Sequence, residues 1–259
     1  MARIVILGAA ESGVGAAILA QKEGFDVFVS DKGSIQNKYK ALLDSHGLPW
    51  EEHQHTEGLI LNADEVIKSP GIPEDAPMVL KIKERRIPIV SEIEFASRYT
   101  DARMIGITGS NGKTTTTSLI YHILRSAGFD VGLAGNIGRS LALQVAEEPH
   151  DWYVIELSSF QLDGMYTFRA NVAVLLNITP DHLDRYDNCM QHYVDAKMRI
   201  LRNQQPDDCF IYWAQDDHVG RELAKYDVES RVCAFSDTEG PGFDAFPTDG
   251  TLHITAPVS

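Results

Sequence analysis

Cysteine is scarce in this sequence, and the cysteines present form no motif. Cys189, Cys209 and Cys233 lie far apart in the chain, so no CxxC pair exists. An odd number of widely spaced cysteines is not the pattern of a secreted domain held together by disulfides. The sequence therefore predicts reduced thiols and a cytoplasmic location.

Positively charged residues are also few, and the sequence has no long apolar run. The chain has 23 Lys and Arg residues against 37 Asp and Glu, a formal net charge of −14. Such an acidic chain is poorly matched to nucleic-acid phosphates or to an anionic membrane surface. No apolar window reaches the ~20 residues of a membrane helix, and Glu11 interrupts the short apolar N-terminus, which is no signal peptide. We expect no nucleic acid and no membrane as partner, and nothing demands more than a monomer.

Strand and helix patterns alternate along the chain. Apolar runs predict strands at 3–8, 26–31, 65–73 (a strand running into a Pro/Gly turn), 87–99 (a strand leading into a helix), 103–108, 130–135, 152–157, 171–178, 209–214, 230–236 and 250–255. Helical patterns occur at 13–24, 77–86, 113–127, 138–147 and 188–203. This alternation is typical of α/β folds with parallel strands and crossover helices.

Two glycine-rich turns, beginning at Gly8 and Gly109, each connect a predicted strand to a helix. They predict two nucleotide-type domains. We place a Rossmann-like parallel-sheet domain at residues 1–93 and a P-loop ATPase-type α/β central domain at residues 94–259.

The second of these turns has the composition of a phosphate-binding loop. Its residues are Gly109, Ser110, Asn111, Gly112, Lys113, Thr114 and Thr115. Glycines let backbone N–H groups approach a phosphate, and a helix N-terminus favours negative charge. Lys113 would reach the terminal phosphates of ATP, and the Thr114 hydroxyl would bind Mg²⁺. The strict motif has glycine where this chain has Ile107, but the flanking strand and helix still favour phosphate binding over a chance polar turn.

Polar side chains also end two other predicted strands. Glu156 stands inside the apolar run "WYVIEL", while Asp181 and His182 follow the run at 171–178. Ligands gather at the carboxyl ends of parallel strands. A carboxylate in an apolar run is costly unless it meets a cation, which favours a metal role for Glu156 over a solvated edge position. For His182, metal or phosphate contact and a solvated loop position both stay open.

Two further features are ambiguous from the residues alone. Lys197 shares a helical stripe with Tyr193 and Leu201, where a lysine normally extends its amine to water. The turn "GAAESGVG" at 8–15 resembles a dinucleotide fingerprint, with Asp31 where the ribose-binding acid would lie. That turn indicates a nucleotide-like ligand without choosing between NAD and another nucleotide.

Several motifs taken together resemble one family. "TGSNGKTTT", "ELSSFQL", "ITPDHLDRY" and "YVDAKMRI" follow one another as they do in the Mur ligases, the ATP-dependent amino-acid ligases of peptidoglycan synthesis, whose family also includes folylpolyglutamate synthases. Within it, "SPGIP", "GNIG" and "ELSSFQL" are most similar to the member that adds D-glutamate to UDP-N-acetylmuramoyl-L-alanine. The alternatives are a sister ligase for another amino acid, an NAD-binding regulatory protein or oxidoreductase, and a non-catalytic nucleotide-sensing module.

The resemblance implies roles for the ambiguous residues, and it implies UDP in place of NAD. The uridine diphosphate would be surrounded by Ser12, Gly13, Asp31, Ser69, Pro70 and Gly71. The muramoyl-alanine arm would pass Asn136, Ser158, Gln161 and His182. Two Mg²⁺ ions are implied, the first held with ATP by Lys113, Thr114 and Glu156. The second would be positioned by His182 and by Lys197, which is carbamylated in this family, so the resemblance replaces the solvated-lysine interpretation.

The implied reaction transfers the γ-phosphoryl group of ATP to the alanine carboxylate, and the D-glutamate amine then attacks the acyl phosphate. Members of the family have a third domain that binds the incoming amino acid. The printed sequence stops at residue 259, before that domain and before the family's histidine–asparagine motif near the base. The resemblance therefore predicts a fragment that binds the UDP substrate, binds ATP weakly and does not ligate.

Overall fold

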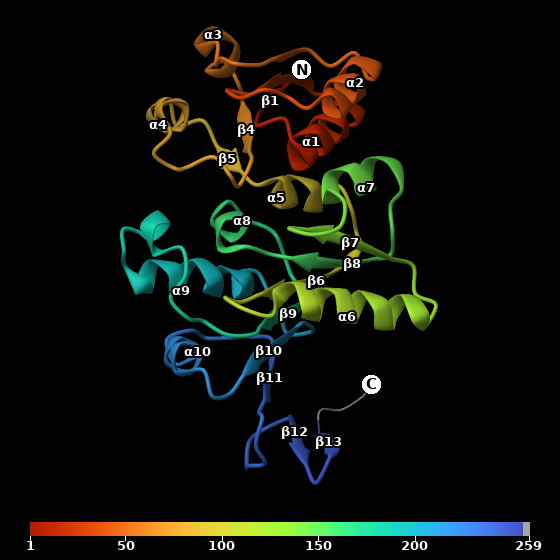
Figure 1. Ribbon diagram of the computed structural model, residues 1–259, viewed down its shortest axis with the longest axis vertical. Helices are drawn as coiled ribbons and strands as arrows, with labels where there is room; N and C mark the ends of the chain where they lie inside the picture. Colours follow the sequence, from red (N-terminus) through yellow and green to blue (C-terminus); the bar gives the residue numbers. More distant parts are fainter. Residues whose placement is uncertain (256–259) are drawn as a thin grey trace.

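The computed structural model describes residues 1–255 and contains two sheets, one above the other along the long axis of the molecule (Figure 1). The first sheet has the strand order β3-β2-β1-β4-β5, and its pairings are all parallel. The second has the order β13-β12-β11-β10-β9-β6-β8-β7 and is parallel except for the β12–β13 hairpin. The predicted α/β class with parallel sheets is confirmed.

The first sheet is covered by helices on both faces. Its strands are β1 (Arg3–Leu7), β2 (Asp26–Ser30), β3 (Trp50–Glu51), β4 (Glu65–Lys68) and β5 (Ile89–Val90). The helices are α1 (Glu11–Lys22), α2 (Asn37–Ser45), α3 (Glu57–Ile60) and α4 (Pro77–Glu84). Helices α1 and α2 pack on the face that carries Ile4 and Ile6, whereas α3 and α4 pack on the face of Val5 and Leu7. Burial on both faces explains why these strands read as continuous apolar runs.

The second sheet follows the connecting helix α5 (Glu92–Ser97). Its strands are β6 (Arg103–Thr108), β7 (Val131–Gly135), β8 (Trp152–Glu156), β9 (Val172–Leu175), β10 (Cys209–Trp213), β11 (Arg231–Phe235), β12 (Ala245–Thr248) and β13 (Thr251–Ile254). Its helices are α6 (Lys113–Ser126), α7 (Leu141–Glu147), α8 (Ser159–Asp163), α9 (Met190–Met198), α10 (Asp217–Leu223) and the 3₁₀ turns η1 (Leu183–Tyr186) and η2 (Arg199–Leu201). We call residues 1–90 the first unit and residues 103–254 the second unit.

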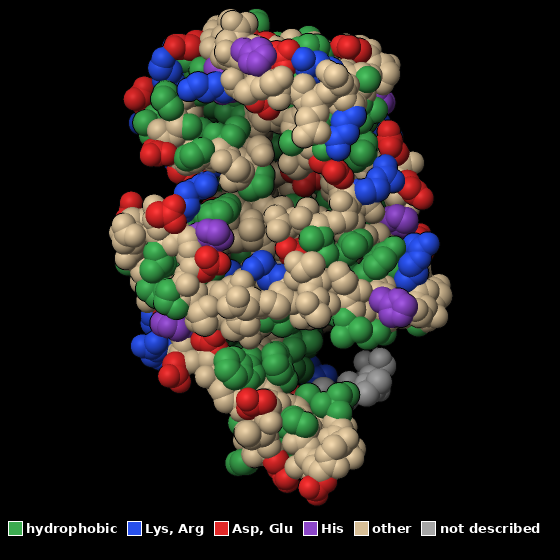
Figure 2. Space-filling model, viewed as in Figure 1, with side chains coloured by type: hydrophobic (Ala, Val, Ile, Leu, Met, Phe, Trp, Pro, Cys, Tyr) green, Lys and Arg blue, Asp and Glu red, His purple; other side chains and the backbone are tan. Residues whose placement is uncertain are grey.

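The two faces of the second sheet are covered unequally. Helix α6 packs alone over Ile105, Val154 and neighbouring apolar side chains, while α7, α8, α9 and α10 cover the opposite face. Figure 2 shows hydrophobic side chains gathered below α6, over β10 and β11. Strand β6 lies between β8 and β9, so the loop that follows it emerges at the middle of the sheet.

The two units share one apolar core through α1, α5 and α7, which meet between the sheets (Figure 1). Phe95 of α5 is fully buried in it, next to residues of both units. Gly15 of α1 lies so close to α7 that an added Cβ would stand 2.1 Å from Ser140 Oγ. This close contact holds the first unit against the second. The predicted domain boundary between residues 93 and 94 falls inside α5 and stays a prediction.

The predicted elements are found with shifted ends, and several short ones were not predicted. Helix α1 begins at Glu11 and not at residue 13, and the predicted helix at 188–203 divides into α9 and η2. The elements without a predicted counterpart are α2, β3, α3, α8, α10 and β12, which are too short or too polar to give a periodic signal. Among residues 1–255, no helix combines the length and the apolar character that crossing a membrane requires.

Candidate nucleotide-binding site

The turn between β6 and α6 adopts a conformation that needs its glycines. Gly109 has a φ of +150° and Gly112 a φ of +84°, where a side chain would be strained. A Cβ on Gly109 would also stand 3.0 Å from the Cβ of Leu176. The Lys113 ammonium folds back over the turn and donates to the carbonyls of Gly109 and Ser110, each at 2.9 Å. The cation thus lies above the helix N-terminus, where a phosphate would be bound.

The end of β9 holds this turn in place. The carbonyl and side-chain oxygens of Asn177 accept the N–H groups of Ser110 and Asn111, at 2.9 and 2.8 Å. The Ser110 hydroxyl donates to the Thr179 carbonyl and accepts the Thr179 N–H, both at 2.9 Å. These bonds use segments far apart in the sequence, so the turn is preorganised before any ligand arrives.

Glu156 ends β8 between β6 and β7 and is only 1% exposed. Its Oε2 accepts the Thr114 hydroxyl at 2.8 Å, and its Oε1 accepts the Asn136 amide at 2.9 Å. The structure therefore brings these three predicted residues together, and the solvated edge position for Glu156 is excluded. Residues 1–255 contain no group of three or more His, Cys, Asp and Glu that could hold a metal. The Glu156–Thr114 pair nevertheless fits Mg²⁺, which takes one or two protein oxygens together with phosphate and water.

Lys197 is buried, with 1% exposure, so the interpretation of an amine extended to water is wrong. Its Nζ donates to the Gly109 carbonyl at 2.8 Å and lies 4.6 Å from the ring centre of Tyr193. Burial lowers the pKa of this amine to about 7; the charge of Lys113 acts in the same direction and that of Asp181 opposes it. A sizeable fraction of Lys197 is therefore an uncharged amine at neutral pH.

His182 lies on the exposed loop before η1, in the left-handed region with a φ of +49°. Its ring packs 5.6 Å from that of Phe160, and its Nε2 is 3.6 Å from the Asp181 carboxylate. A cavity of about 290 Å³ joins this loop to the first unit and to residues 109–115, which we call the phosphate turn after its predicted ligand. Its lining includes Pro70, Gly71, Lys113, Asn136, Ser158, Phe160, Asp181, His182, Tyr193 and Lys197. Residues predicted from separate motifs thus face one space.

The glycine-rich turn of the first unit packs against the turn that follows β4. Gly8 has a φ of +92°, and a Cβ there would stand 2.7 Å from the Cβ of Ser69. A Cβ on Gly13 would stand 1.9 Å from the Gly8 carbonyl oxygen, so the close approach of α1 to β1 requires glycine. The Asp31 carboxylate accepts the N–H groups of Ala9 and Gly33, both at 2.7 Å, and organises the same turn.

Ser158 and Gln161 cap helix α8. The Ser158 hydroxyl accepts the Gln161 N–H at 3.3 Å, and the Gln161 side chain accepts the Ser158 N–H at 2.9 Å. Ser158 also lines the cavity, while Gln161 is 5% exposed and its side chain hydrogen-bonds to Ser158 within the cap. Ser12 is half-buried in the first turn of α1. That Gln161 and Ser12 contact a substrate stays a prediction.

Several residues of the site were not predicted from the sequence. Tyr193 stacks beside Lys197, and its hydroxyl is 3.0 Å from Ser110 Oγ. Thr179 holds the phosphate turn, as described above. The signal for Tyr193 was its position four residues before Lys197 on one helical face. Thr179 gives no comparable signal, because its partner lies 69 residues away in the chain.

Two family models match the chain. The Mur ligase middle domain matches residues 107–246, more than half of the chain, and the MurD N-terminal domain matches residues 3–78. The first range contains the phosphate turn, Glu156, His182 and Lys197, and the second contains the glycine turn and Asp31. Both halves of the cavity therefore fall within matched regions.

Several curated relatives are named UDP-N-acetylmuramoylalanine–D-glutamate ligase. The protein of Bacteroides thetaiotaomicron is 65% identical over 259 residues, which is 100% of this chain and 58% of that relative. The protein of Porphyromonas gingivalis is 63% identical over 233 residues, covering 90% of this chain and 52% of that relative. The chain thus spans little more than half the length of these relatives.

Solved structures with the same fold include the UDP-N-acetylmuramate:L-alanyl-gamma-D-glutamyl-meso-diaminopimelate ligase of Neisseria meningitides. Its TM-score is 0.66 at 19% identity, covering 98% of this chain and 85% of that one. The UDP-N-acetylmuramate–alanine ligase of Thermotoga maritima has a TM-score of 0.57 at 22% identity, covering 95% and 54%. At these identities the likeness is one of fold, whereas the match to the middle-domain model shows the family. The chain belongs to the Mur ligase family.

Proposed function

We propose that the whole protein is an ATP-dependent ligase of peptidoglycan synthesis that adds D-glutamate to UDP-N-acetylmuramoyl-L-alanine in the cytoplasm. The observation that carries this proposal is the single cavity shared by Pro70 and Gly71 of the first unit and by Lys113, His182 and Lys197 of the second. The high identity to relatives with this name supports the choice of substrates. We further propose that these 259 residues bind the UDP substrate as a monomer but do not ligate.

ATP would bind with its phosphates over the turn from Gly109 to Thr115. Lys113 would move from its two carbonyl partners to the terminal phosphates, and Thr114 and Glu156 would hold Mg²⁺. When bound, Mg²⁺ supplies positive charge between the phosphates and the substrate carboxylate, two anions that otherwise repel. The separation of Glu156 from water strengthens its attraction to a cation.

The substrate would span both units. The uridine diphosphate would lie against Ser12, Gly13, Asp31 and the 69–71 turn, and the muramoyl-alanine arm would reach Asn136, Ser158, Gln161 and His182. In this scheme the site's residues position the two substrates and neutralise their charge, so their contribution is alignment and charge neutralisation.

The proposed ligation consumes only ATP, UDP-N-acetylmuramoyl-L-alanine and D-glutamate. The alanine carboxylate attacks the γ-phosphorus of ATP, the bond to ADP breaks, and an acyl phosphate forms. The D-glutamate amine attacks the acyl carbon, phosphate leaves with the bonding electron pair, and the amide nitrogen loses a proton. In this scheme Lys113 lowers the repulsion of the first step and His182 orients the arm.

Lys197 would act as a carbamate. Its neutral amine adds to CO₂, forms an N–C bond and releases one proton, which leaves a carboxylate-like group in the cavity. The lowered pKa of this lysine supports the reaction, because only the uncharged amine is a nucleophile. The carbamate and His182 would hold a second Mg²⁺ beside the phosphate turn.

Thermal unfolding of this 259-residue chain with different ligands tests the proposal. The four ligands are UDP-N-acetylmuramoyl-L-alanine, UDP-N-acetylmuramate, UDP and NAD⁺. A ligand at a hundred times its dissociation constant stabilises by about 2.7 kcal/mol, which is roughly 5–10 °C for a chain of this size. We expect the largest rise with the alanyl nucleotide. An equal or larger rise with UDP-N-acetylmuramate would favour a sister ligase, and a rise with NAD⁺ alone would refute the proposal.

A further inference from the structure

Helix α5 connects the two units and carries two buried glutamates. Glu92 is 5% exposed and Glu94 is fully buried. A buried carboxylate is costly unless several donors satisfy it. Most of the donors to Glu94 come from one loop of the second unit, residues 164–171 between α8 and β9, which we call the α8–β9 loop.

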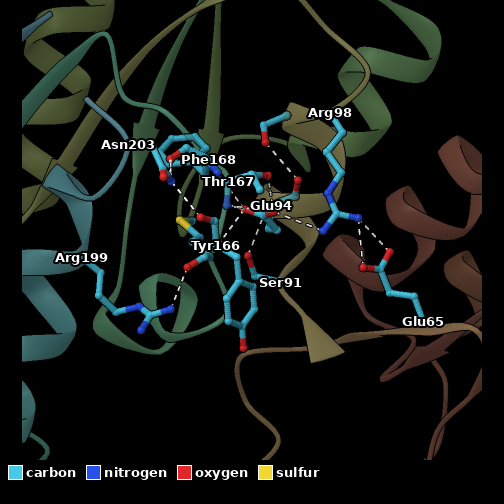
Figure 3. A network of polar contacts seen from close by, with 11 residues as sticks. Glu65, Ser91, Glu94, Arg98, Tyr166, Thr167, Phe168, Arg199 and Asn203 are labelled. Carbon is cyan, nitrogen blue, oxygen red and sulfur yellow. Dashed lines mark hydrogen bonds and ion pairs between the residues drawn. The ribbon is translucent and has the colours of Figure 1, made fainter. Parts of the chain in front are cut away.

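The Glu94 carboxylate gathers four donors from this loop (Figure 3). It accepts the backbone N–H groups of Tyr166 at 3.0 Å, Thr167 at 3.0 Å and Phe168 at 2.8 Å. The Thr167 hydroxyl adds a fourth bond of 2.6 Å. Burial by itself raises the pKa of Glu94, but these hydrogen bonds outweigh it and the net pKa lies below its usual value. Glu94 is therefore ionised at neutral pH.

The same carboxylate is linked to the first unit through Arg98. The Arg98 guanidinium donates to Glu94 at 3.2 Å and to both oxygens of Glu65, on β4, at 3.0 and 2.9 Å. Ser91, the residue before α5, donates its N–H to the Gly164 carbonyl at 2.9 Å. The strand that ends in the 69–71 turn is thus joined to the α8–β9 loop by one chain of ion pairs and hydrogen bonds.

The loop and the end of α8 are also fastened to the segment that directly follows α9, the helix that carries Lys197. Arg199 donates to the carbonyls of Leu162 and Met165 at 2.9 and 2.7 Å. Asn203 donates to the carbonyls of Tyr166 and Phe168, both at 2.9 Å (Figure 3). Helix α8, which Ser158 caps, leads directly into this loop. A shift of the loop would therefore move both walls of the second unit's part of the cavity.

We propose that Glu94 is a positioning residue that sets the spacing between the 69–71 turn of the first unit and the Ser158 and Lys197 walls of the second. This inference rests on the proposed function, because a ligand that spans both units is what makes the spacing matter. The affinity for a ligand held by the first unit alone does not depend on this spacing. Glu94 itself lies outside the residues that line the cavity.

Isothermal titration of this chain with UDP and with UDP-N-acetylmuramoyl-L-alanine tests the inference. Glu94→Gln keeps the side-chain size but replaces one accepting oxygen by a donor. Thr167→Val removes only the hydroxyl bond to Glu94. This milder variant keeps the inference testable if Glu94→Gln does not fold. Glu57→Gln, at an exposed glutamate that begins α3, is the matched control. We expect Glu94→Gln to weaken the spanning ligand about tenfold and Thr167→Val to weaken it less, with the UDP affinity unchanged in both.

Hydrogen exchange provides a second, independent measurement. Glu94→Gln should speed exchange of the amides of residues 166–168 while β1 and β6 stay protected, which separates a displaced loop from an unfolded chain. Unchanged affinity for the spanning ligand would overturn the inference and leave the proposed function standing. Equal weakening of both ligands would overturn it too, since that result marks a general loss of structure. Failure of the unaltered chain to bind either ligand would refute the proposed function, and this inference with it.

Discussion

Glu92 accepts a hydrogen bond of 2.7 Å from the hydroxyl of Ser140, which caps the first turn of α7. The same oxygen accepts the Ala142 N–H at 2.6 Å. Burial raises the pKa of Glu92 to about 7; the bonds from Ala142 and Ser140 work against this rise, and the charge of Glu11 adds to it. Glu92, at the junction of the two units, therefore binds its proton more tightly in the folded chain than in the unfolded chain.

Glu92 makes stability depend on pH in a defined direction. Between the ordinary glutamate pKa of 4.5 and a pKa of about 7, the folded chain binds more protons here than the unfolded chain does. The free energy of unfolding contributed by this group therefore falls as pH rises through that window. Glu92→Gln keeps the accepting oxygen and removes the ionisation. We expect it to be more stable than the unaltered chain above pH 7, by on the order of 3 kcal/mol.

Urea unfolding at pH 5 and pH 8 measures this effect. The advantage of Glu92→Gln should be small at pH 5 and large at pH 8. Glu57→Gln, at an exposed position, should show no such difference. An advantage of equal size at both pH values would show that Glu92 is ionised in the folded chain throughout.

The closeness of α1 and α7 predicts a second effect. In Gly15→Ala the new Cβ would stand 2.1 Å from Ser140 Oγ and 2.8 Å from Ser140 Cβ, so the two helices must separate. We expect a loss of about 1–3 kcal/mol, as is usual for overpacking. Gly58→Ala is the control, because its Cβ would meet nothing within 4 Å. Thermal unfolding of both variants is the measurement, and a Gly15→Ala midpoint equal to that of Gly58→Ala would contradict the packing described here.

Much of the fold was readable from the sequence because its strands are apolar on both faces. The bounds of β6 agree with the predicted strand, and the phosphate turn follows it as expected. The predicted helix differs from α6 only at its C-terminal end, by one residue. The long helix at 188–203 was predicted as one element, but its last turn tightens into η2. Local periodicity identifies the longer elements well, but it gives their ends poorly and misses short or polar elements.

The candidate site was only partly readable. The phosphate turn is local in sequence, so its chemistry can be recognised from ten residues. The burial of Lys197 could not be read, because its partner, the Gly109 carbonyl, lies 88 residues away. The role of Glu94 was hidden for the same reason. Its donors are mostly backbone N–H groups more than 70 residues away, and backbone groups leave no mark in a sequence.

The phosphate turn predicts a selective loss of nucleotide binding. In Lys113→Met the cation that folds over the turn is removed, while the glycines and the hydrogen bonds that the turn donates to Asn177 remain. Loss of a hydrogen bond to a charged group is worth about 1.5–3 kcal/mol, which corresponds to a roughly 10- to 100-fold weaker affinity. Titration with Mg·ATP should show this loss and titration with UDP should not. Lys38→Met, at an exposed lysine on α2, serves as control. Equal loss of UDP affinity would mean that the substitution disturbs the fold and not the turn.

The proposed carbamylation of Lys197 predicts a direct spectroscopic signal. The amine is buried, uncharged in part at neutral pH, and held 2.8 Å from the carbonyl of Gly109. Incubation with ¹³C-bicarbonate should give one protected carbamate resonance in the carbon NMR spectrum. Lys197→Met has a side chain of similar length without an amine and should lack the resonance. Lys113→Met should retain it, because burial, the largest cause of the lowered pKa of Lys197, remains in that variant. A resonance that persists in Lys197→Met would place the carbamate on another amine, and the proposed second Mg²⁺ position would then lose its carboxylate-like ligand.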